Sequence, residues 1–119
     1  MAVIKAFECI RPDEKVADRV AALPYDVYNR EEALKEVERE PLSFLAIDRA
    51  ETQFDSSVDT YADCVYDKAR ELLDSRIADG TFITDTDKAY YVYELTMNGR
   101  TQTGIAACAS IDDYNNKYY

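Results

Sequence analysis

The sequence predicts an α+β fold: a small mixed or antiparallel sheet that contains a C-terminal hairpin, with about three helices packed on it. The hairpin is indicated by Asn98-Gly99, the preferred pair for a two-residue turn, between the apolar segments 89–97 and 100–110. The helices are indicated by apolar residues that recur every three or four positions in residues 29–39 and 60–79. Because a two-stranded hairpin is at best marginally stable alone, other strands and the helices are expected to cover it.

The first half of the chain contains four expected elements. They are strands at residues 3–10 and 42–48, and helices at residues 12–23 and 29–39. Pro24 must end the earlier helix, because proline lacks an amide hydrogen and keeps the residue before it out of the helical region. Asn29 is expected to cap the later helix, and Glu32, three residues on, to complete a capping box.

The second half is expected to hold one long helix and the hairpin. The helix at residues 60–79 is followed by Gly80, where a left-handed residue commonly ends a helix, and then by a short strand or extended link at residues 81–84. In the predicted hairpin register, Tyr93 lies opposite Gly104. The apolar helix residues expected to face the core are Val16, Val20, Leu23, Ala33, Leu34, Val37, Ala62, Val65, Ala69, Leu72, Leu73 and Ile77.

The length of the chain fits one domain spanning residues 1–119. Residues 112–119 carry no pattern that ends a fold, so the chain is expected to be cut from a longer protein. The remainder of that full-length chain is then one expected partner.

Composition and charge exclude several function classes. The chain has 14 Lys and Arg against 24 Asp and Glu, a formal net charge of -10. Such a surface repels phosphate backbones and anionic lipids, so non-specific nucleic-acid binding is not expected. A local basic pocket is still able to hold one phosphate, because salt screens charges beyond about 10 Å. No apolar segment is long enough to predict a membrane span.

The types of titratable residue limit which side chains are able to serve in acid–base catalysis. The chain has no histidine, so acid–base chemistry would depend on Asp, Glu, Lys, Tyr or Cys. Cys9, Cys64 and Cys108 are widely spaced and odd in number, which is typical of reduced core residues in a cytoplasmic protein. The cysteines therefore predict no zinc site, and no set of metal-ligating residues is assigned.

The connector at residues 23–29 is the strongest candidate for a binding site, because it places tyrosines and a carboxylate between two helices. Asp26 fits a general base or a Mg²⁺ ligand, but aspartate in a turn more commonly accepts hydrogen bonds from its own backbone. Tyr25 and Tyr28 fit stacking on a base or sugar, although tyrosines at the boundary of a core are commoner.

Other candidates lie at the ends of the two predicted N-terminal strands. Arg49 fits a clamp for phosphate or carboxylate, and equally a surface ion pair with its acidic neighbours, among them Glu51. Arg11 is a second candidate clamp, for which a solvated charge is the commoner role. Ser43 fits a phosphate contact but not a hydrolase nucleophile, because no histidine is present to activate it. We expect Arg49 and the turn at residues 24–26 to meet at one edge of the sheet.

Several segments together resemble the N-terminal region of the bacterial and archaeal DUF1015 family. They are Pro24-Tyr25-Asp26-Val27, Ser43-Phe44-Leu45, Asp48-Arg49-Ala50-Glu51, Tyr91-Val92-Tyr93, Thr103-Gly104-Ile105-Ala106 and Asp112-Asp113-Tyr114. The resemblance spans nearly the whole chain at matching spacing, and family members are longer. The chain departs from the family pattern at Ala50, where proline is favoured, and before Pro41, where asparagine is favoured.

The resemblance implies a function only by analogy. The family is uncharacterised, and its members are often labelled ParB-like, which implies kinship with nucleotide-binding partition proteins, sulfiredoxin and free-serine kinases. That kinship implies a nucleotide with Mg²⁺ as cofactors and phosphoryl transfer as the reaction. The arginine-rich phosphate motif of partition proteins is not present, and three isolated glycines do not form a phosphate-binding loop.

Two main hypotheses follow, and the residues by themselves indicate no reaction. In the first, the domain binds a small anionic ligand such as a nucleotide and transfers a phosphoryl group. Its catalytic residues would be Asp26 and Glu51, and its ligand-binding residues Arg11, Tyr25, Ser43 and Arg49. In the second, the domain is a non-catalytic module that binds a ligand or another protein. A purely structural role is the third alternative.

Overall fold

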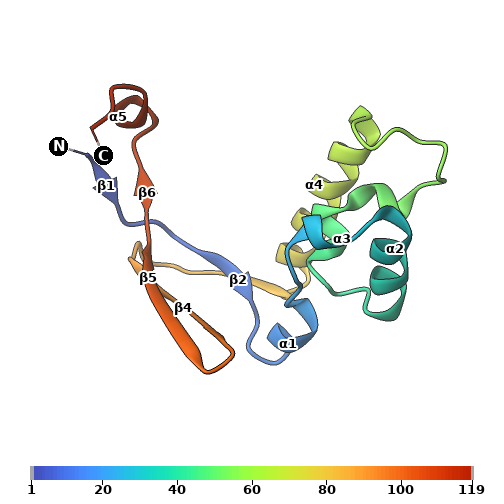
Figure 1. Ribbon diagram of the computed structural model, residues 1–119, viewed down its shortest axis with the longest axis horizontal. Coiled ribbons are helices and arrows are strands. Elements are labelled where there is room, and N and C mark those ends of the chain that lie inside the picture. The colour runs from blue at the N-terminus through green and yellow to red at the C-terminus, as the bar shows by residue number, and fades with distance from the viewer. Residues whose placement is uncertain (1, 119) are drawn as a thin grey trace. The chain divides into compact units, whose positions relative to one another are not determined.

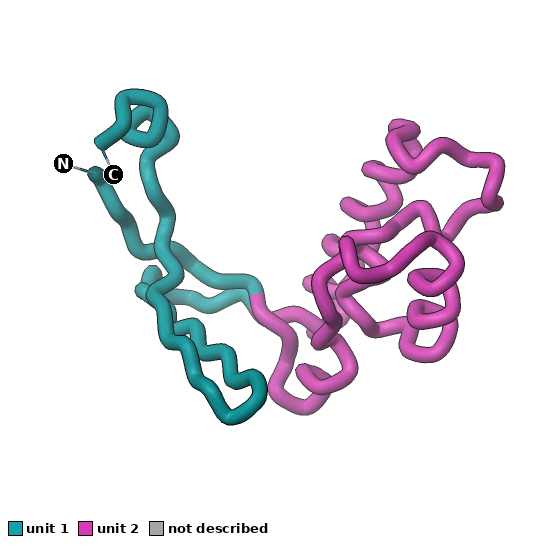
Figure 2. Tube along the Cα trace, in the orientation of Figure 1, with its two compact units in different colours: residues 1–10, 84–119 teal, residues 11–83 magenta. Residues whose placement is uncertain are grey.

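The computed structural model describes residues 2–118 and has an α+β fold, as predicted (Figure 1). The chain forms two compact units (Figure 2). Unit 1 comprises Met1–Ile10 and Thr84–Tyr119, and unit 2 comprises Arg11–Ile83. Unit 2 is mainly helical, whereas unit 1 contains most of the strands. The expectation of a single domain within a longer protein stays a prediction.

Unit 2 is built from helices and short 3₁₀ turns. Its elements are α1 (Ala17–Val20), the 3₁₀ turn η1 (Tyr25–Val27), α2 (Arg30–Arg39), α3 (Leu45–Asp48), the 3₁₀ turn η2 (Ala50–Gln53) and α4 (Asp63–Ala78). Two short strands, β2 (Ile10–Pro12) and β3 (Phe82–Thr84), pair with each other, and the division between the units falls within them.

Helix α2 begins where the sequence predicts. The side chain of Asn29 accepts a hydrogen bond of 2.9 Å from the Glu32 amide, and the Glu32 carboxylate accepts one of 2.9 Å from the Asn29 amide. Together these bonds form the predicted capping box. Ala33 and Val37 are buried, as expected, while Leu34 remains 38% exposed.

The core of unit 2 forms where α2 meets α3. Ala33 and Val37 of α2 pack with Leu45 and Ala46 of α3, and Tyr28 and Leu72 cover this cluster from the side. Leu45 has no exposed surface. The core is small, so polar contacts that hold the surrounding loops carry much of the structure.

The predicted strand at residues 42–48 is wrong, because this segment is helical. Phe44 already has helical backbone angles, φ -60° and ψ -21°, and Leu45–Asp48 forms α3. A strand would direct Leu45 and Ala46 to opposite faces, whereas one helical turn buries both against α2. Packing in the core therefore determines the conformation of this segment, whose apolar composition is compatible with both a strand and a helix.

Helix α4 confirms the predicted long helix, and Gly80 follows it with a φ of +85°, as expected. Val65 is buried, but the other fully buried side chain of this helix is Arg76. Its guanidinium donates to the carbonyl oxygens of Pro41, at 2.7 Å, and Ser43, at 3.3 Å. It also lies 5.8 Å from the centre of the Phe82 ring. Arg76 thus fixes the loop that leads into α3.

Helix α1 is much shorter than the predicted helix at residues 12–23. It covers only Ala17–Val20, and Ala21 already has extended angles, three residues before Pro24. Val20 is buried, as expected, but Leu23 is 63% exposed. A four-residue stretch buries one apolar side chain, so little packing energy favours extending it.

Unit 1 holds the remaining elements. These are β1 (Ile4–Lys5), β4 (Tyr91–Met97), β5 (Arg100–Ala106), β6 (Cys108–Ala109) and α5 (Ile111–Asn115). The predicted strand at residues 3–10 is divided, because β1 pairs with β6, Phe7 bridges to Ala89 and the segment then enters β2. This segment therefore pairs with three different parts of the chain in succession, whereas its apolar composition predicts one continuous strand.

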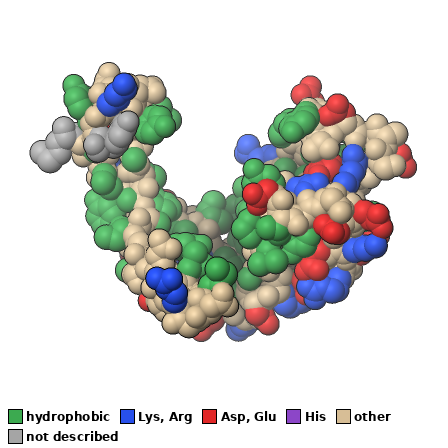
Figure 3. Space-filling view, viewed as in Figure 1, with side chains coloured by type: hydrophobic (Ala, Val, Ile, Leu, Met, Phe, Trp, Pro, Cys, Tyr) green, Lys and Arg blue, Asp and Glu red, His purple; other side chains and the backbone are tan. Residues whose placement is uncertain are grey.

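The hairpin β4–β5 confirms the predicted turn and register. Asn98 and Gly99 have φ of 51° and 74°, as a type I′ turn requires, and Tyr93 pairs with Gly104. Val92 and Ile105 face each other and are 75% and 78% exposed. Figure 3 shows hydrophobic side chains spread over the surface of unit 1, whereas most charged side chains in view lie on unit 2.

The cysteines are free, but they are not the core residues that the sequence predicts. Cys64 and Cys108 are exposed, and only Cys9 is partly buried. Cys64 lies in the first turn of α4 and Cys108 in the two-residue strand β6, where neither element covers its side chain. None of the helices within residues 2–118 combines the length and the apolar character that crossing a membrane requires.

Candidate functional site

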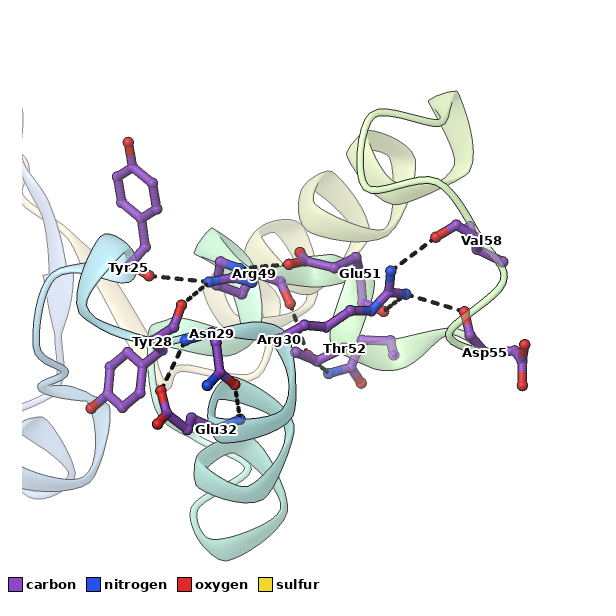
Figure 4. A network of polar contacts seen from close by, with 11 residues as sticks. Tyr25, Tyr28, Asn29, Arg30, Glu32, Arg49, Glu51, Thr52, Asp55 and Val58 are labelled. Atoms are coloured by element: carbon purple, nitrogen blue, oxygen red, sulfur yellow. Dashed lines mark hydrogen bonds and ion pairs between the residues drawn. The ribbon is translucent and has the colours of Figure 1, made fainter.

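Arg49 joins the two segments that the sequence marks as candidates. It follows α3 directly, and its Nη1 donates to the carbonyl oxygens of Tyr25, at 3.2 Å, and Tyr28, at 2.7 Å (Figure 4). The expected meeting of Arg49 with the turn at residues 24–26 is therefore confirmed. It takes place among the helices of unit 2, however, and not at the edge of a sheet, because the predicted second strand is α3.

The charge of Arg49 is balanced by a buried carboxylate. Its Nε donates to Oε1 of Glu51 at 2.5 Å, and Glu51 is only 2% exposed. The alternative of an ion pair with a neighbouring acid is thus the arrangement that the structure adopts, but the pair is buried and not on the surface. The second oxygen of Glu51, Oε2, has no hydrogen-bond partner among the described residues.

Arg30 holds the next loop in the same way. From the first turn of α2, its guanidinium donates to the carbonyl oxygens of Val58 and Asp55, each at 3.1 Å, and to that of Glu51 at 3.5 Å (Figure 4). Arg49 therefore holds the backbone around η1, and Arg30 holds the backbone of η2 and of the loop that follows it. Arg30 was not among the residues predicted for the site.

A cleft of about 450 Å³ opens beside Arg49. Its lining combines aromatic rings, carboxylates and a short apolar floor. The lining residues are Tyr25, Asp26, Ile47, Asp48, Arg49, Ala50, Glu51, Thr60, Tyr61, Val65, Tyr66 and Ala69. All of them belong to unit 2. With three carboxylates and one guanidinium, the lining has a formal charge of −2 when every group is ionised.

The carboxylates of the cleft differ in their surroundings. Asp26 and Asp48 are exposed, and within residues 2–118 neither side chain has a hydrogen bond or an ion pair. The protein atoms around Asp48 nevertheless desolvate its carboxyl group in part, which raises its pKa above the usual 3.8. The ionised form of Asp48 is therefore less favourable in this position than in water, and a positively charged neighbour would offset this loss of free energy.

The tyrosine rings of the cleft are available for contact. Tyr25, Tyr61 and Tyr66 are 57%, 79% and 57% exposed. Their hydroxyl groups make no hydrogen bond to another described residue. Such rings offer both apolar faces and polar edges to a bound molecule.

Four of the six residues predicted for the site line this cleft: Tyr25, Asp26, Arg49 and Glu51. Ser43 and Arg11 do not. Ser43 is buried, and its hydroxyl accepts a hydrogen bond of 3.3 Å from the Leu45 amide. Arg11 lies in β2, outside the lining.

Tyr61 and Tyr66 line the cleft but were not predicted as site residues, although both flank the apolar stripe of the predicted long helix. Helical spacing accounts for Tyr66, because Val65, Tyr66 and Ala69 lie within one turn of α4. Tyr61 precedes the extended residue Ala62 and the start of the helix, so helical spacing does not place it. Asp48 was visible only as one of several acids beside Arg49.

No group of three or more Cys, Asp or Glu side chains in the described part of the chain is arranged to hold a metal ion. A metal in the cleft would therefore need ligands from the bound molecule as well as from the protein.

The comparisons with known proteins give one family. A protein-family model with the description "Protein of unknown function (DUF1015)" matches residues 4–118. Searches of curated proteins and of solved structures found no match. Since the family model covers almost the whole chain, this chain belongs to the DUF1015 family.

Proposed function

We propose that unit 2 is a ligand-binding module and that its cleft accepts a small organic molecule. The observation that carries the proposal is the pair of arginine clamps. Arg49 binds the backbone of Tyr25 and the side chain of Glu51, and Arg30 binds the backbone of Glu51, so these parts of the cleft lining are held before any ligand arrives. A site that is already ordered loses less conformational freedom on binding, which favours affinity.

The size and lining of the cleft support the same proposal. Its volume of about 450 Å³ is within the usual range for small-molecule sites. Tyr61 and Tyr66 supply ring faces, Val65 and Ala69 an apolar floor, and Asp48 a polar group that would orient a ligand. No proton transfer or group transfer is needed to explain this arrangement.

Binding of a Mg²⁺-nucleotide with phosphoryl transfer is the second candidate. The observation in its favour is that Arg49 and Asp26 line one cleft, and that Nη2 of Arg49 has no partner among the described residues. Arg49 would hold a phosphate, and Asp26 would accept a proton or bind Mg²⁺. Glu51 is less suited to catalysis, because it already neutralises Arg49.

A ligand screen on the intact protein tests both candidates. Thermal unfolding is measured with ATP, ADP and Mg²⁺, and with a library of small organic molecules. The first candidate expects stabilisation by library compounds that Tyr66→Ala reduces. Tyr93→Ala is the matched control, since Tyr93 is 59% exposed on the hairpin of unit 1, outside the cleft.

The outcomes separate the candidates. Stabilisation by Mg²⁺-ATP that is lost in Asp26→Asn, together with ADP formation, would establish the second candidate in place of the first. If no compound or nucleotide stabilises the protein, or if Tyr93→Ala reduces stabilisation as much as Tyr66→Ala, the proposed ligand-binding function is wrong.

A further inference from the structure

We propose that the ligand of this cleft is an organic cation, with an ammonium or guanidinium group attached to an apolar or aromatic body. This inference rests on the proposed function, since it assigns the chemical class of the molecule that the cleft binds. Three features of the lining carry it: the balance of charges, the exposed tyrosine rings and the unpaired carboxylates.

The charge balance disfavours an anion. Glu51 neutralises Arg49 at 2.5 Å, and two backbone carbonyl oxygens occupy the Nη1 atom of the same guanidinium. Asp26 and Asp48 then face the cleft with no positive group of the described chain against them. An anion would meet these two carboxylates, whereas a cation would neutralise one or both.

The tyrosine rings fit the same ligand class. Tyr25, Tyr61 and Tyr66 line the cleft with more than half of each side chain exposed. The face of an aromatic ring is electron-rich and attracts ammonium and guanidinium groups, and several rings around one pocket are a common arrangement for recognising organic cations. Ile47, Val65 and Ala69 complete the lining with surface suited to the carbon skeleton of such a molecule.

An inorganic cation fits less well. Among the residues that the structure describes, no three acidic or cysteine side chains are grouped closely enough to coordinate a metal ion. Mg²⁺ and Ca²⁺ require about six oxygen ligands or more, but an organic ammonium group needs only one carboxylate and a ring face.

The surroundings of Asp48 agree with the same ligand class. Its carboxyl group lies among atoms that disfavour its ionised form, which a mutation to asparagine would relieve. A residue that lowers the stability of the free protein but improves binding is expected to show both effects on substitution. An aspartate that does not contact the ligand would show the gain in stability on substitution but no change in the preference for charge.

The test compares three ligands that share one ring and differ in charge. They are 2-phenylethylamine, 2-phenylethanol and 3-phenylpropionate, which carry a positive, no and a negative charge at neutral pH. Binding to the whole chain is measured from NMR amide shifts of the cleft residues. We expect the amine to bind at least about tenfold more tightly than the alcohol and the acid not to bind, because charge-assisted contacts are clearly stronger than neutral ones.

Three variants test whether the preference for the amine arises at the cleft. Asp48→Asn should reduce the preference for the amine over the alcohol and raise the unfolding temperature. Asp67→Asn is the control, because Asp67 is an exposed aspartate of α4 outside the cleft lining, and it should change neither quantity. If Asp48→Asn and Asp26→Asn both keep the full preference for the amine, the proposed assignment is wrong.

Further ligands distinguish the source of the cationic group. Agmatine represents a free guanidinium compound, and a blocked tripeptide with a central arginine represents a basic peptide. Binding of either supports the ligand class, and their relative affinity indicates which source the cleft favours. If the alcohol or the acid binds as well as the amine, the ligand class is wrong but the ligand-binding function stands. If none of these compounds binds while other library compounds stabilise the protein, the ligand class is wrong and the ligand-binding function stands.

Discussion

Replacement of Arg49 by methionine should strongly destabilise unit 2. The side chain of Arg49 is 16% exposed and that of Glu51 is 2% exposed, so the substitution leaves the desolvated carboxylate of Glu51 without its partner. Removing one member of a buried ion pair typically costs about 3–5 kcal/mol. The carbonyl oxygens of Tyr25 and Tyr28 lose their donor as well, although water in the cleft can replace it in part.

Urea unfolding followed by circular dichroism measures this cost. With a typical dependence of about 1–3 kcal/mol per molar urea, the midpoint should fall by about 2 M. Arg70→Met is the control, because Arg70 forms an exposed ion pair with Asp74 in the adjacent helix α4. Such pairs contribute only about 0.3–0.5 kcal/mol.

A double variant separates the ion pair from the other contacts of Arg49. Arg49→Met combined with Glu51→Gln removes both charges, so it should be less destabilising than Arg49→Met alone. The reasoning is refuted if Arg49→Met and Arg70→Met shift the midpoint equally. It is also refuted if adding Glu51→Gln to Arg49→Met lowers the stability again by about as much as Arg49→Met alone.

Three further predictions concern the core, the cleft and the hairpin. Leu45→Ala should cost about 2–5 kcal/mol in urea unfolding, because Leu45 is fully buried, whereas Phe44→Ala, at a position 37% exposed, should cost clearly less. Asp48→Asn should stabilise the protein at neutral pH, because the raised pKa of Asp48 means that its ionised form is less favourable in the folded protein than in the unfolded chain. In thermal unfolding, the stability difference between the variant and the unmodified protein should disappear as the pH falls from the raised pKa through 3.8. Gly99→Ala should destabilise the hairpin by about 1–2 kcal/mol, because Gly99 has a φ of 74°, and faster amide exchange in β4 and β5 would reveal it.

Elements specified by a few adjacent residues were predicted correctly from the sequence. The capping box of Asn29 and Glu32 determines the start of α2, and Asn98-Gly99 determines the hairpin register, because each depends on hydrogen bonds within a few residues. Segment 42–48 depends instead on distant partners. Its helical form requires the α2 surface that receives Leu45 and the Arg76 side chain from α4.

The candidate site was predicted in the same partial way. The proximity of Arg49 to the turn at residues 24–26 follows from placing polar residues at the ends of adjacent elements, and this holds even though one element was assigned the wrong structure. Tyr66 was not assigned to the site, because its role depends on which side of α4 faces η2, and the amphipathic pattern alone leaves that side open. Tyr61 was not assigned either, because it lies in a turn before α4 whose course the sequence pattern does not indicate. Ser43 was assigned to the site because the sequence alone does not show whether a serine is buried or exposed.

One structural device recurs throughout unit 2: an arginine that binds backbone carbonyl oxygens of a loop. Arg76 holds Pro41 and Ser43, Arg49 holds Tyr25 and Tyr28, and Arg30 holds Asp55 and Val58. These contacts involve separate side chains on three different elements. A planar guanidinium with five donors suits this task, because it reaches two carbonyl groups at once.

This device explains how a unit with a small apolar core can keep a defined cleft. Carbonyl groups near the surface would otherwise be bound by water, and the loops that carry them would sample many conformations. Lysine offers a single charged nitrogen without the fixed fork, so it would restore the charge of Arg49 but not both carbonyl contacts together with the Glu51 pair. Arg49→Lys should therefore keep the fold better than Arg49→Met and still loosen the turn at Tyr25. In amide exchange, the turn should then open faster while the buried core around Leu45 stays protected, and equal protection of both regions would show that charge alone holds the cleft.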